Sequence, residues 1–311
     1  MLIIIMIMNC SLLIGKQERK TVSELKVTTL STMLTNGKGI GEWGYSALVE
    51  VDGRKILFDT GSRPKTVLLN AEELNIDLSD VQDVFLSHHH WDHIGGLLTL
   101  RKELKKQNPK ALNRIHVGEG IFSKRVNSDN TIFAIRDELE ADGVKFITYS
   151  NNQELFPGVW ITGPISRLHD ERNWSGNGKI ETDIGIIDDN IPEDQSLVID
   201  TKDGLILISG CGHAGLINTL EHVSKNGNDQ KIFTIIGGFH LFSASEEQLK
   251  WTASKLRDFG ITKIIGAHCT GINALYTLRD LLEMNRGDAI VGSVGDSFNL
   301  KTGIKAGLIA K

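Results

Sequence analysis

Hydrophobic and polar positions along the chain predict strands first, and then strands that alternate with helices. Two apolar stretches, Tyr45–Val51 and Lys55–Phe58, flank an Asp-Gly pair, which is a strong signal for a β-hairpin. A helix is predicted over Pro64–Leu74, and the next apolar stretch, Val81–Ser87, has the length of a buried strand. The N-terminal part of the fold is therefore expected to be a hairpin followed by a β–α unit.

The pattern continues into a helix that is expected to start near Gly95. Leu97, Leu100 and Leu104 recur at spacings of three and four, which suits one buried helix face. The region from residue 108 to residue 194 is less regular. It contains the following expected elements: strands near Ile115 and Phe146, a helix over Thr131–Ala141, and a loop-rich segment from Pro164 to Ile180.

The C-terminal third repeats the plan of the N-terminal part. Its expected elements are a hairpin formed by Ser196–Asp200 and Leu205–Ser209, strands at Phe233–Ile236 and Lys263–Gly266, and a helix through Leu249, Ala253 and Leu256 between these strands. No low-complexity linker separates the two halves. We therefore expect one α/β domain, residues 21–311, in which two sheets pack together and helices lie outside.

Composition and charge narrow the class of protein. The chain has 311 residues, 40% hydrophobic and 23% charged, which is typical of a globular protein in water. A net charge of −5 gives no reason to expect a nucleic-acid surface, so the expected partner is a small-molecule substrate. The oligomeric state is left open.

The first residues need separate treatment. Met1–Gly15 is almost wholly apolar but too short for a membrane-spanning helix. It has the length of a signal-peptide core, and Cys10 suggests a lipid-attachment site, yet it lacks leading basic residues and an Ala-x-Ala cleavage site. Residues 1–20 are therefore interpreted as an export or lipid-anchor segment, with a cytoplasmic tail or a misassigned translation start as alternatives. Localisation is periplasmic or exported in the first case and cytoplasmic otherwise.

Four potential metal ligands lie within six residues, directly after the strand that ends near Ser87. They are His88, His90, Asp92 and His93. Alternate residues of an extended segment point the same way, so the first two histidines can share one ion. Once the chain turns into a helix, the other two side chains can reach a second ion. Imidazole and carboxylate suit zinc, manganese or iron.

The sequence His-x-His-x-Asp-His after a strand resembles the signature of the metallo-β-lactamase superfamily. The segment Leu-Phe-Asp-Thr-Gly, residues 57–61, also resembles the N-terminal half of that superfamily. The likeness extends from about Lys26 to Phe298. It implies an αββα sandwich of two mixed sheets with helices outside and two metal ions at one edge.

Three further histidines follow apolar strands in glycine-rich segments. They are His213 in Gly-Cys-Gly-His, His240 in Gly-Gly-Phe-His and His268 in Ala-His-Cys-Thr-Gly. Each strand precedes a helix, which brings these histidines toward the edge that carries the first cluster. The three segments resemble the branch of the superfamily that is similar to the dihydropterin-ribofuranosylaminobenzene-phosphate synthases.

The resemblance implies a ligand set. His213 completes the first metal site, and His268 completes the second with Asp92 and His93. The family usually supplies a bridging aspartate where this chain has Cys211, which leaves a thiolate ligand or a bridging water as alternatives. His169 is the competitor for the place of His213. Cys269 and His116 are expected to have structural roles, and His222 is expected at the surface.

The expected activity is that of a metal-dependent hydrolase. Two divalent ions, zinc first and manganese or iron as alternatives, acidify a water molecule for attack on an ester, phosphoester or lactone. Asp92 is expected to orient that water, and His240 is the candidate for proton transfer to the leaving group. A pterin-related synthase or an iron-dependent redox enzyme on the same fold is the alternative, and a binding module without catalysis is a third.

Overall fold

The computed structural model describes residues 20–128, 130–171, 178–227 and 230–309. The predicted export or anchor segment therefore lies outside the described residues, except for Lys20. Among the residues that are described, no helix combines the length and the apolar character needed to cross a membrane.

Eight strands form the first sheet, in the order β19-β18-β1-β3-β4-β5-β6-β7. In chain order they are β1 (Leu25–Ser31), β3 (Ser46–Val51), β4 (Arg54–Phe58), β5 (Asp83–Phe85), β6 (Arg114–Gly118), β7 (Lys145–Tyr149), β18 (Ser297–Asn299) and β19 (Gly303–Lys305). β3 and β4 are the predicted antiparallel hairpin, whereas β4 to β7 run parallel to one another. The sheet is therefore mixed.

Seven strands form the second sheet, in the order β16-β15-β14-β13-β12-β9-β8. In chain order they are β8 (Gln153–Phe156), β9 (Val159–Ile161), β12 (Leu197–Thr201), β13 (Gly204–Ser209), β14 (Ile232–Gly237), β15 (Lys263–Gly266) and β16 (Ala289–Val291). β12 and β13 are an antiparallel hairpin, and β13, β14 and β15 are parallel. The carboxyl ends of these three parallel strands consequently meet at one edge.

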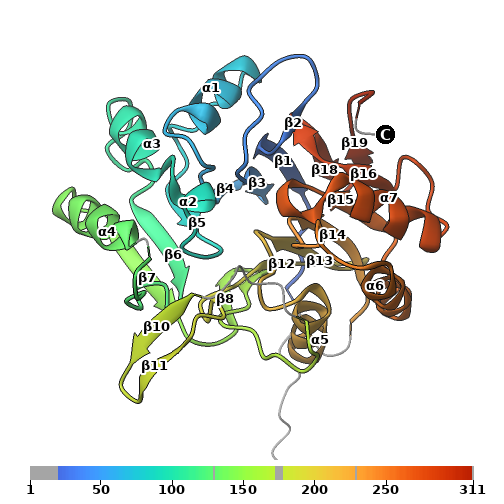
Figure 1. Ribbon diagram of the computed structural model, residues 1–311. Coiled ribbons are helices and arrows are strands. Elements are labelled where there is room, and N and C mark those ends of the chain that lie inside the picture. The colour runs from blue at the N-terminus through green and yellow to red at the C-terminus, as the bar shows by residue number, and fades with distance from the viewer. Residues whose placement is uncertain (1–19, 129, 172–177, 228–229, 310–311) are drawn as a thin grey trace, which may run out of the picture.

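The two sheets pack face to face, and helices cover their outer faces (Figure 1). The helices are α1 (Thr66–Glu73), α2 (Trp91–Ile94), α3 (Leu97–Leu104), α4 (Thr131–Ala141), α5 (Leu216–Asn226), α6 (Glu246–Phe259) and α7 (Ile272–Leu281), with a short 3-10 helix, η1 (His268–Thr270). Apolar side chains of β1, β3, β12 and β13 fill the space between the sheets. One separate apolar cluster lies under α1, α3 and α4, and another under α5, α6 and α7. This is the expected αββα sandwich.

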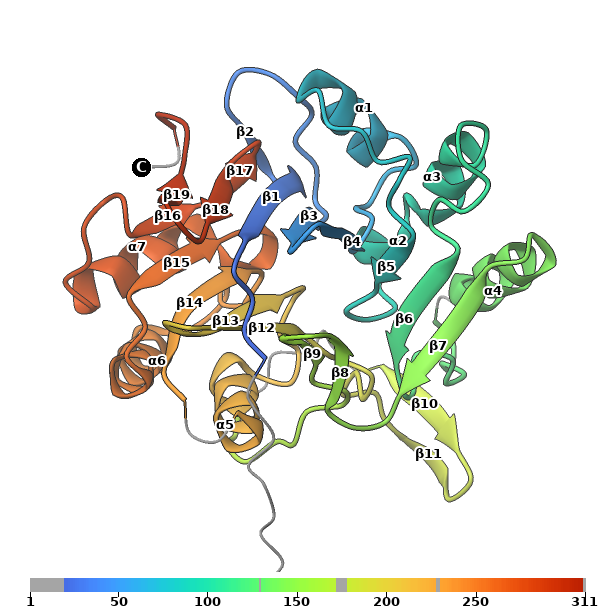
Figure 2. The ribbon, with the colours of Figure 1, turned by 180° about the vertical axis from the view of Figure 1, so that it is seen from behind.

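Two small sheets complete the fold. β2 (Leu34–Thr35) pairs with β17 (Ser293–Val294), and β10 (Lys179–Thr182) forms a hairpin with β11 (Gly185–Asp188). The β10–β11 hairpin projects beyond β7 and β8 (Figure 2). It falls in the region between residues 108 and 194, which is thus more regular than the sequence pattern indicates.

Two predicted boundaries are wrong, whereas the helix expected to start near Gly95 is confirmed as α3, with Gly96 as its N-cap; the short helix α2 before it was not predicted. The strand expected over Val81–Ser87 is limited to β5, because the residues after Phe85 turn away to form the histidine segment, residues 88–93. The loop expected to reach Ile180 ends earlier, because β10 begins at Lys179. Strand pairing and close packing, which the local pattern does not report, set these ends.

Candidate metal centre

The histidine segment crosses the edge of the first sheet between β5 and α2. His90, the N-cap of α2, has φ −60° and ψ 144°, so the segment is still extended where it meets the helix. His88 and His90 consequently lie on the same side. His89 points elsewhere, and its Nδ1 lies 2.7 Å from Oε1 of the buried Glu193. The alternating direction of the side chains thus places His88 and His90 as candidate ligands on one side, whereas His89 is bound by Glu193.

Three imidazole nitrogens converge at a first point. His88 Nε2 lies 3.0 Å from His90 Nδ1 and 3.2 Å from His213 Nε2. His88 and His213 are fully buried, and His90 is half-buried. We call His88, His90 and His213 the first triad. Burial lowers the pKa of His88 and His90 well below the usual histidine value, with further lowering by the neighbouring histidines, so both are neutral and able to bind a metal.

A second set of donor atoms converges beside the first triad. Asp92 Oδ2 lies 3.2 Å from His268 Nε2 and 3.9 Å from His93 Nε2. All three side chains are buried, and their potential ligand atoms lie within 4.8 Å of one another. We call Asp92, His93 and His268 the second triad. Burial raises the pKa of Asp92, but the two histidines outweigh it and lower that pKa to about 2.

Asp59, at the end of β4, orients both triads from behind. Its Oδ2 lies 2.7 Å from His93 Nδ1 and accepts a hydrogen bond from Ser87 Oγ, also at 2.7 Å. Because Ser87 donates its only hydroxyl proton to Asp59, it accepts one from His88 Nδ1, at 2.9 Å. In the neutral, metal-binding form of each ring, the proton is then on Nδ1 and the Nε2 lone pair faces its triad.

The orienting role of Asp59 is absent from the sequence prediction, although its motif is not. Residues 57–61, Leu-Phe-Asp-Thr-Gly, are recognised there only as a segment that resembles the N-terminal half of the superfamily. Asp59 is fully buried with a positive φ of 50°, a conformation that Asp tolerates better than most residues. A charged residue that directly follows an apolar strand is the signal that could have identified it.

Cys211 lies between the two triads. Its Sγ is 3.1 Å from His93 Nε2 and 3.2 Å from Cys269 Sγ. Both cysteines are buried, and neither forms a disulfide. Burial raises the pKa of the Cys211 thiol. A thiolate at this place would therefore need a cation beside it.

The second sheet delivers its ligand candidates through close backbone packing. His213, His240 and His268 follow the parallel strands β13, β14 and β15 and come together at their carboxyl ends, near the histidine segment. A Cβ atom on Gly210 would lie 2.0 Å from Ser87 Oγ, and one on Gly237 would lie 1.8 Å from the Ser209 carbonyl oxygen. Glycine is thus required at residue 210 for the two sheets to approach each other at the site, and at residue 237 for β14 to pack beside β13 within the second sheet.

Unpartnered buried nitrogens show that the residues fit a metal ion. Nδ1 of His268 has no hydrogen-bond partner and Nε2 has only the ion-pair contact with Asp92 Oδ2 at 3.2 Å, although the side chain is 1% exposed. The cost of burying such a group without a partner is about 1–3 kcal/mol, which coordination would offset. The donors are imidazole, carboxylate and thiol, the set that zinc, manganese and iron accept. The chemistry of this edge therefore matches a site for divalent metal ions.

Other candidates from the sequence lie outside the triads. His169 Nε2 is 3.6 Å from Glu221 Oε1 and its ring contacts Trp251, so the structure places it away from the first triad, where His213 lies. His116 is buried between Asp83 and Tyr149. His240 reaches the triads, with its ring centroid 4.7 Å from that of His213.

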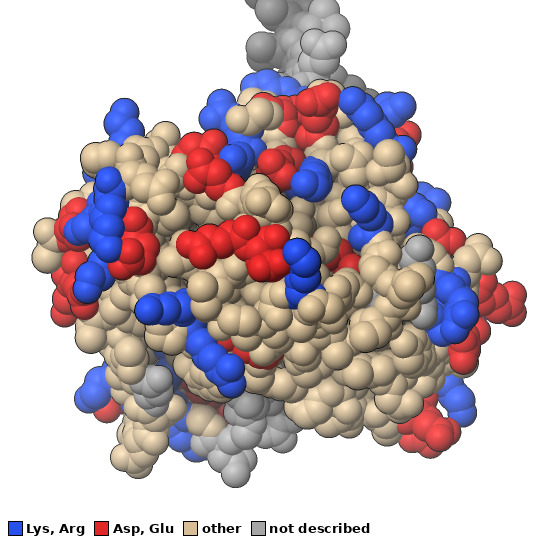
Figure 3. All heavy atoms as spheres, turned by 90° about the horizontal axis from the view of Figure 1, so that it is seen from above, with Lys and Arg blue, Asp and Glu red and all other residues tan. Residues whose placement is uncertain are grey.

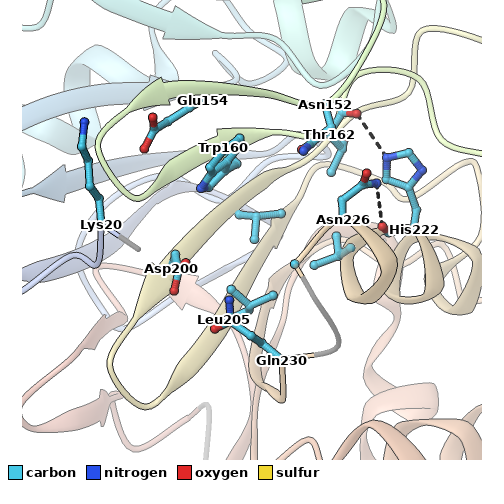
Figure 4. A pocket seen from close by; sticks show the side chains of 13 residues that line it. Lys20, Asn152, Glu154, Trp160, Thr162, Asp200, Leu205, His222, Asn226 and Gln230 are labelled. Atoms are coloured by element: carbon cyan, nitrogen blue, oxygen red, sulfur yellow. Dashed lines mark hydrogen bonds between the residues drawn. The ribbon is translucent and has the colours of Figure 1, made fainter. Parts of the chain in front are cut away.

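A separate cavity of about 250 Å³ lies beside α5 and the β8–β9 edge (Figure 4). His222 lines it, half-buried rather than at the surface, and donates from Nε2 to the Thr162 carbonyl oxygen at 3.3 Å. Trp160 and Asp200 form part of the wall. None of the candidate metal ligands lines this cavity, which distinguishes it from the cavity of about 400 Å³ over the triads.

Known proteins resemble the chain in sequence. A model of the metallo-β-lactamase superfamily matches residues 44–147. A 7,8-dihydropterin-6-methyl-4-(β-D-ribofuranosyl)-aminobenzene-5′-phosphate synthase from Methanocaldococcus jannaschii is 30% identical over 270 residues, 81% of this chain and 90% of the relative. The chain belongs to the metallo-β-lactamase superfamily. Its likeness to the synthase confirms the predicted branch.

Solved structures of the metallo-β-lactamase superfamily share the fold. Tm1679, described as a metal-dependent hydrolase of the β-lactamase superfamily, has a TM-score of 0.72 at 25% identity and covers 88% of this chain and 98% of its own. YhfI from Bacillus subtilis, described as a metallo-β-lactamase fold protein, has a TM-score of 0.55 at 13% identity, covering 89% and 100%. The superfamily fold implies that this chain binds divalent metal ions.

Proposed function

We propose that this protein is a metal-dependent hydrolase and that its two triads bind a pair of divalent metal ions. The observation that carries the proposal is the convergence of the triads. The first offers three imidazoles and the second a carboxylate with two imidazoles, side by side at one cavity. Zinc is the metal that we expect first, since it accepts this mixture of nitrogen, oxygen and sulfur donors.

Two divalent ions at such a site supply Lewis acidity, which acidifies water and stabilises the negative charge that develops on the substrate. Asp92 contributes a carboxylate with a lowered pKa of about 2, so it stays ionised and can accept a hydrogen bond from the water it orients. The protein thereby holds the nucleophile on one side of an ester, phosphoester or lactone.

His240 is our candidate for moving a proton to the leaving group. It lines the cavity, and its buried Nδ1 has no hydrogen-bond partner. A positive φ of 48° and a hydrogen bond from its backbone N–H to Cys269 Sγ fix the turn that presents the ring. The ring stands beside His213 and Phe242, between the first triad and the outer part of the cavity.

The synthase from Methanocaldococcus jannaschii favours a second candidate function. That relative matches most of this chain, and its name describes the synthesis of a pterin-linked aminobenzene ribofuranosyl phosphate. A synthase of this kind would use the same two triads. It would differ from the hydrolase in its product, so the reaction rather than the metal content separates the two.

The first test combines elemental analysis of protein purified without chelator with hydrolysis of a phosphodiester, a phosphomonoester, a lactone and a β-lactam. About two zinc or manganese ions per chain and chelator-sensitive turnover are expected. His88→Ala and His268→Ala should each lower the metal content by about one ion, while His222→Gln, in the separate cavity, should leave it unchanged. Protein without bound metal would refute the proposal, and metal-loaded protein that hydrolyses none of the four would favour the synthase.

Cys211 is proposed as an additional ligand, and cobalt substitution tests it. A thiolate bound to cobalt gives a charge-transfer absorption in the near ultraviolet, so Cys211→Ser should remove that band. Cys269→Ser is the matched control, because Cys269 is equally buried and lies 3.2 Å from Cys211 Sγ. Retention of the band in Cys211→Ser would assign the thiolate ligand to another cysteine, and absence of the band from the unsubstituted protein would leave the bridge to water alone.

A further inference from the structure

Three exposed aromatic side chains stand on the rim of the cavity over the triads. Trp43 is 43% exposed, Trp91 53% and Phe242 53%, and all three line the cavity. They come from different parts of the chain: the segment between β2 and β3, the first turn of α2, and the turn between β14 and α6. We call these three residues the aromatic rim.

Exposed aromatic side chains are concentrated at the rim and are rare on the rest of the described surface. Among the described residues, four tryptophan and phenylalanine side chains are exposed, and Trp251, at 36%, is the only one of them outside the rim. Leaving several large rings in water at one place forgoes the stabilisation that their burial would give. A cluster of this kind indicates a surface that becomes covered when a ligand binds.

Ring contacts hold part of the rim in place. Trp43 and Phe242 meet edge to face, with centroids 5.9 Å apart and planes at 89°. Trp43 also packs against the ring of His268, at 4.9 Å, which ties the rim directly to the second triad. Trp91 precedes Asp92 in the sequence and makes no ring contact with another described aromatic residue. A planar group that binds beside Trp91 would therefore lie next to the second triad.

The charges around the cavity select against highly anionic ligands. Its described lining includes the carboxylates Asp92 and Asp189 but neither lysine nor arginine. Arg125, which lies behind the wall, is buried and already paired with Asp189 and Glu193. Outside the two proposed metal sites, a substrate with several phosphate groups would meet these carboxylates and no described lysine or arginine of the cavity lining.

From the rim and its charge we infer that the substrate carries a planar aromatic ring and no polyphosphate, and that the ring packs against Trp91 and the Trp43–Phe242 corner. The inference names the class of substrate that binds in this cavity, and it rests on the proposed function for the bond that is cleaved. An aryl ester or an aryl-substituted lactone fits this description. Polynucleotides and nucleoside polyphosphates do not.

Calorimetric titration of the purified full-length protein with 2-naphthylmethanol tests the inference without any hydrolysable bond. Its saturated counterpart, decahydro-2-naphthylmethanol, is a matched probe of similar apolar size without the flat π-system. We expect the aromatic alcohol to bind at least about fivefold more tightly, because ring–ring contacts add to area burial. Equal affinity of the two probes would overturn the inference.

Substitutions locate the binding. Trp91→Leu and Phe242→Leu keep an apolar side chain but remove the ring, and each should weaken naphthylmethanol binding by about fivefold to tenfold. Trp251→Leu, outside the cavity, is the matched control and should bind as the unmodified protein does. Unchanged binding in both rim variants would refute the inference, whereas intact aromatic binding in a protein that hydrolyses no aryl ester would refute only the hydrolase.

Discussion

At the scale of single residues, Asp59 determines which nitrogen of two histidines faces the metal centre. It does so directly for His93 and through Ser87 for His88. Removing the charge while keeping the shape should therefore affect metal binding more than folding.

Asp59→Asn should weaken metal binding at the second triad by about tenfold to a hundredfold, the range found when a carboxylate behind a ligating histidine is lost. An amide can present its NH2 group to His93 and so favour the wrong tautomer. Competition with a chelating dye measures the affinity. Asp137→Asn, at an exposed aspartate, serves as control, and an unchanged affinity in Asp59→Asn would show that the tautomer is fixed by other means.

His88 and His90 make the stability of the metal-free protein depend on pH. Burial lowers the pKa of His88 and His90, so the unfolded chain binds more protons than the folded one below about pH 6.5. The free energy of unfolding should then fall as pH drops from 7 to 5, by up to about 1.4 kcal/mol per pH unit for each histidine. Urea unfolding of chelated protein checks this, and His90→Gln should have the shallower slope; equal slopes would contradict it.

His93 shifts in the opposite direction. Burial lowers its pKa, but Asp59 and Asp92 outweigh burial and raise it to about 9. Its contribution to the stability of the metal-free protein is complete below the unfolded value of about 6.5 and is lost as pH rises through 9. Stability of the chelated protein should accordingly decline on the alkaline side as well.

At the scale of elements, the glycine pair after the histidine segment packs α2 and α3 against the turn that follows β4. A Cβ on Gly95 would lie 1.9 Å from the Ser62 carbonyl oxygen, and one on Gly96 would lie 2.2 Å from that of Thr60. Glycine is needed at both positions because the close neighbour is the backbone of residues 60–62.

Gly95→Ala should destabilise the protein by about 3 kcal/mol, because its methyl group collides with backbone that cannot rotate away. Denaturant unfolding measures the change, and metal content should fall with it since α2 carries Asp92 and His93. Gly287→Ala is the control, as no atom lies within 4 Å of its added Cβ. If both variants unfold alike, the packing at residue 95 is looser than the distances indicate.

At the scale of the whole molecule, the metal centre joins the two sheets. The histidine segment leaves the first sheet, whereas His213 and His268 leave the second. The outer surface carries interspersed acidic and basic side chains on the face seen from above (Figure 3), a distribution that agrees with the low net charge. That no nucleic acid binds stays a prediction.

Metal binding should therefore stabilise the entire domain. At a free zinc concentration of a hundred times Kd, the stabilisation is about 2.7 kcal/mol for each site. Thermal unfolding with and without zinc measures it as an increase in Tm. A His88→Ala/His268→Ala double variant should lose most of that increase, and an equal increase in the variant would mean that zinc binds elsewhere.

The sequence by itself determined the fold class, the hairpins and the candidate ligands. Alternating apolar stretches with Asp-Gly and Lys-Asp-Gly turns report local pairing, and the helix over Thr131–Ala141 was predicted with its observed bounds. The histidine segment was recognisable because its residues are neighbours in the chain. Local periodicity and motif spacing are physical properties of short segments, so they can be read without the rest of the molecule.

Only the tertiary structure decided what lies between and behind those segments. The place of Cys211 between the triads, the contact of Asp59 with His93 and the assembly of Trp43, Trp91 and Phe242 on one rim each join residues that are distant in sequence. Such contacts depend on how two sheets pack and on which strands are parallel. Sequence periodicity describes the faces of individual strands and helices, whereas the relative position of those faces is fixed by long-range packing.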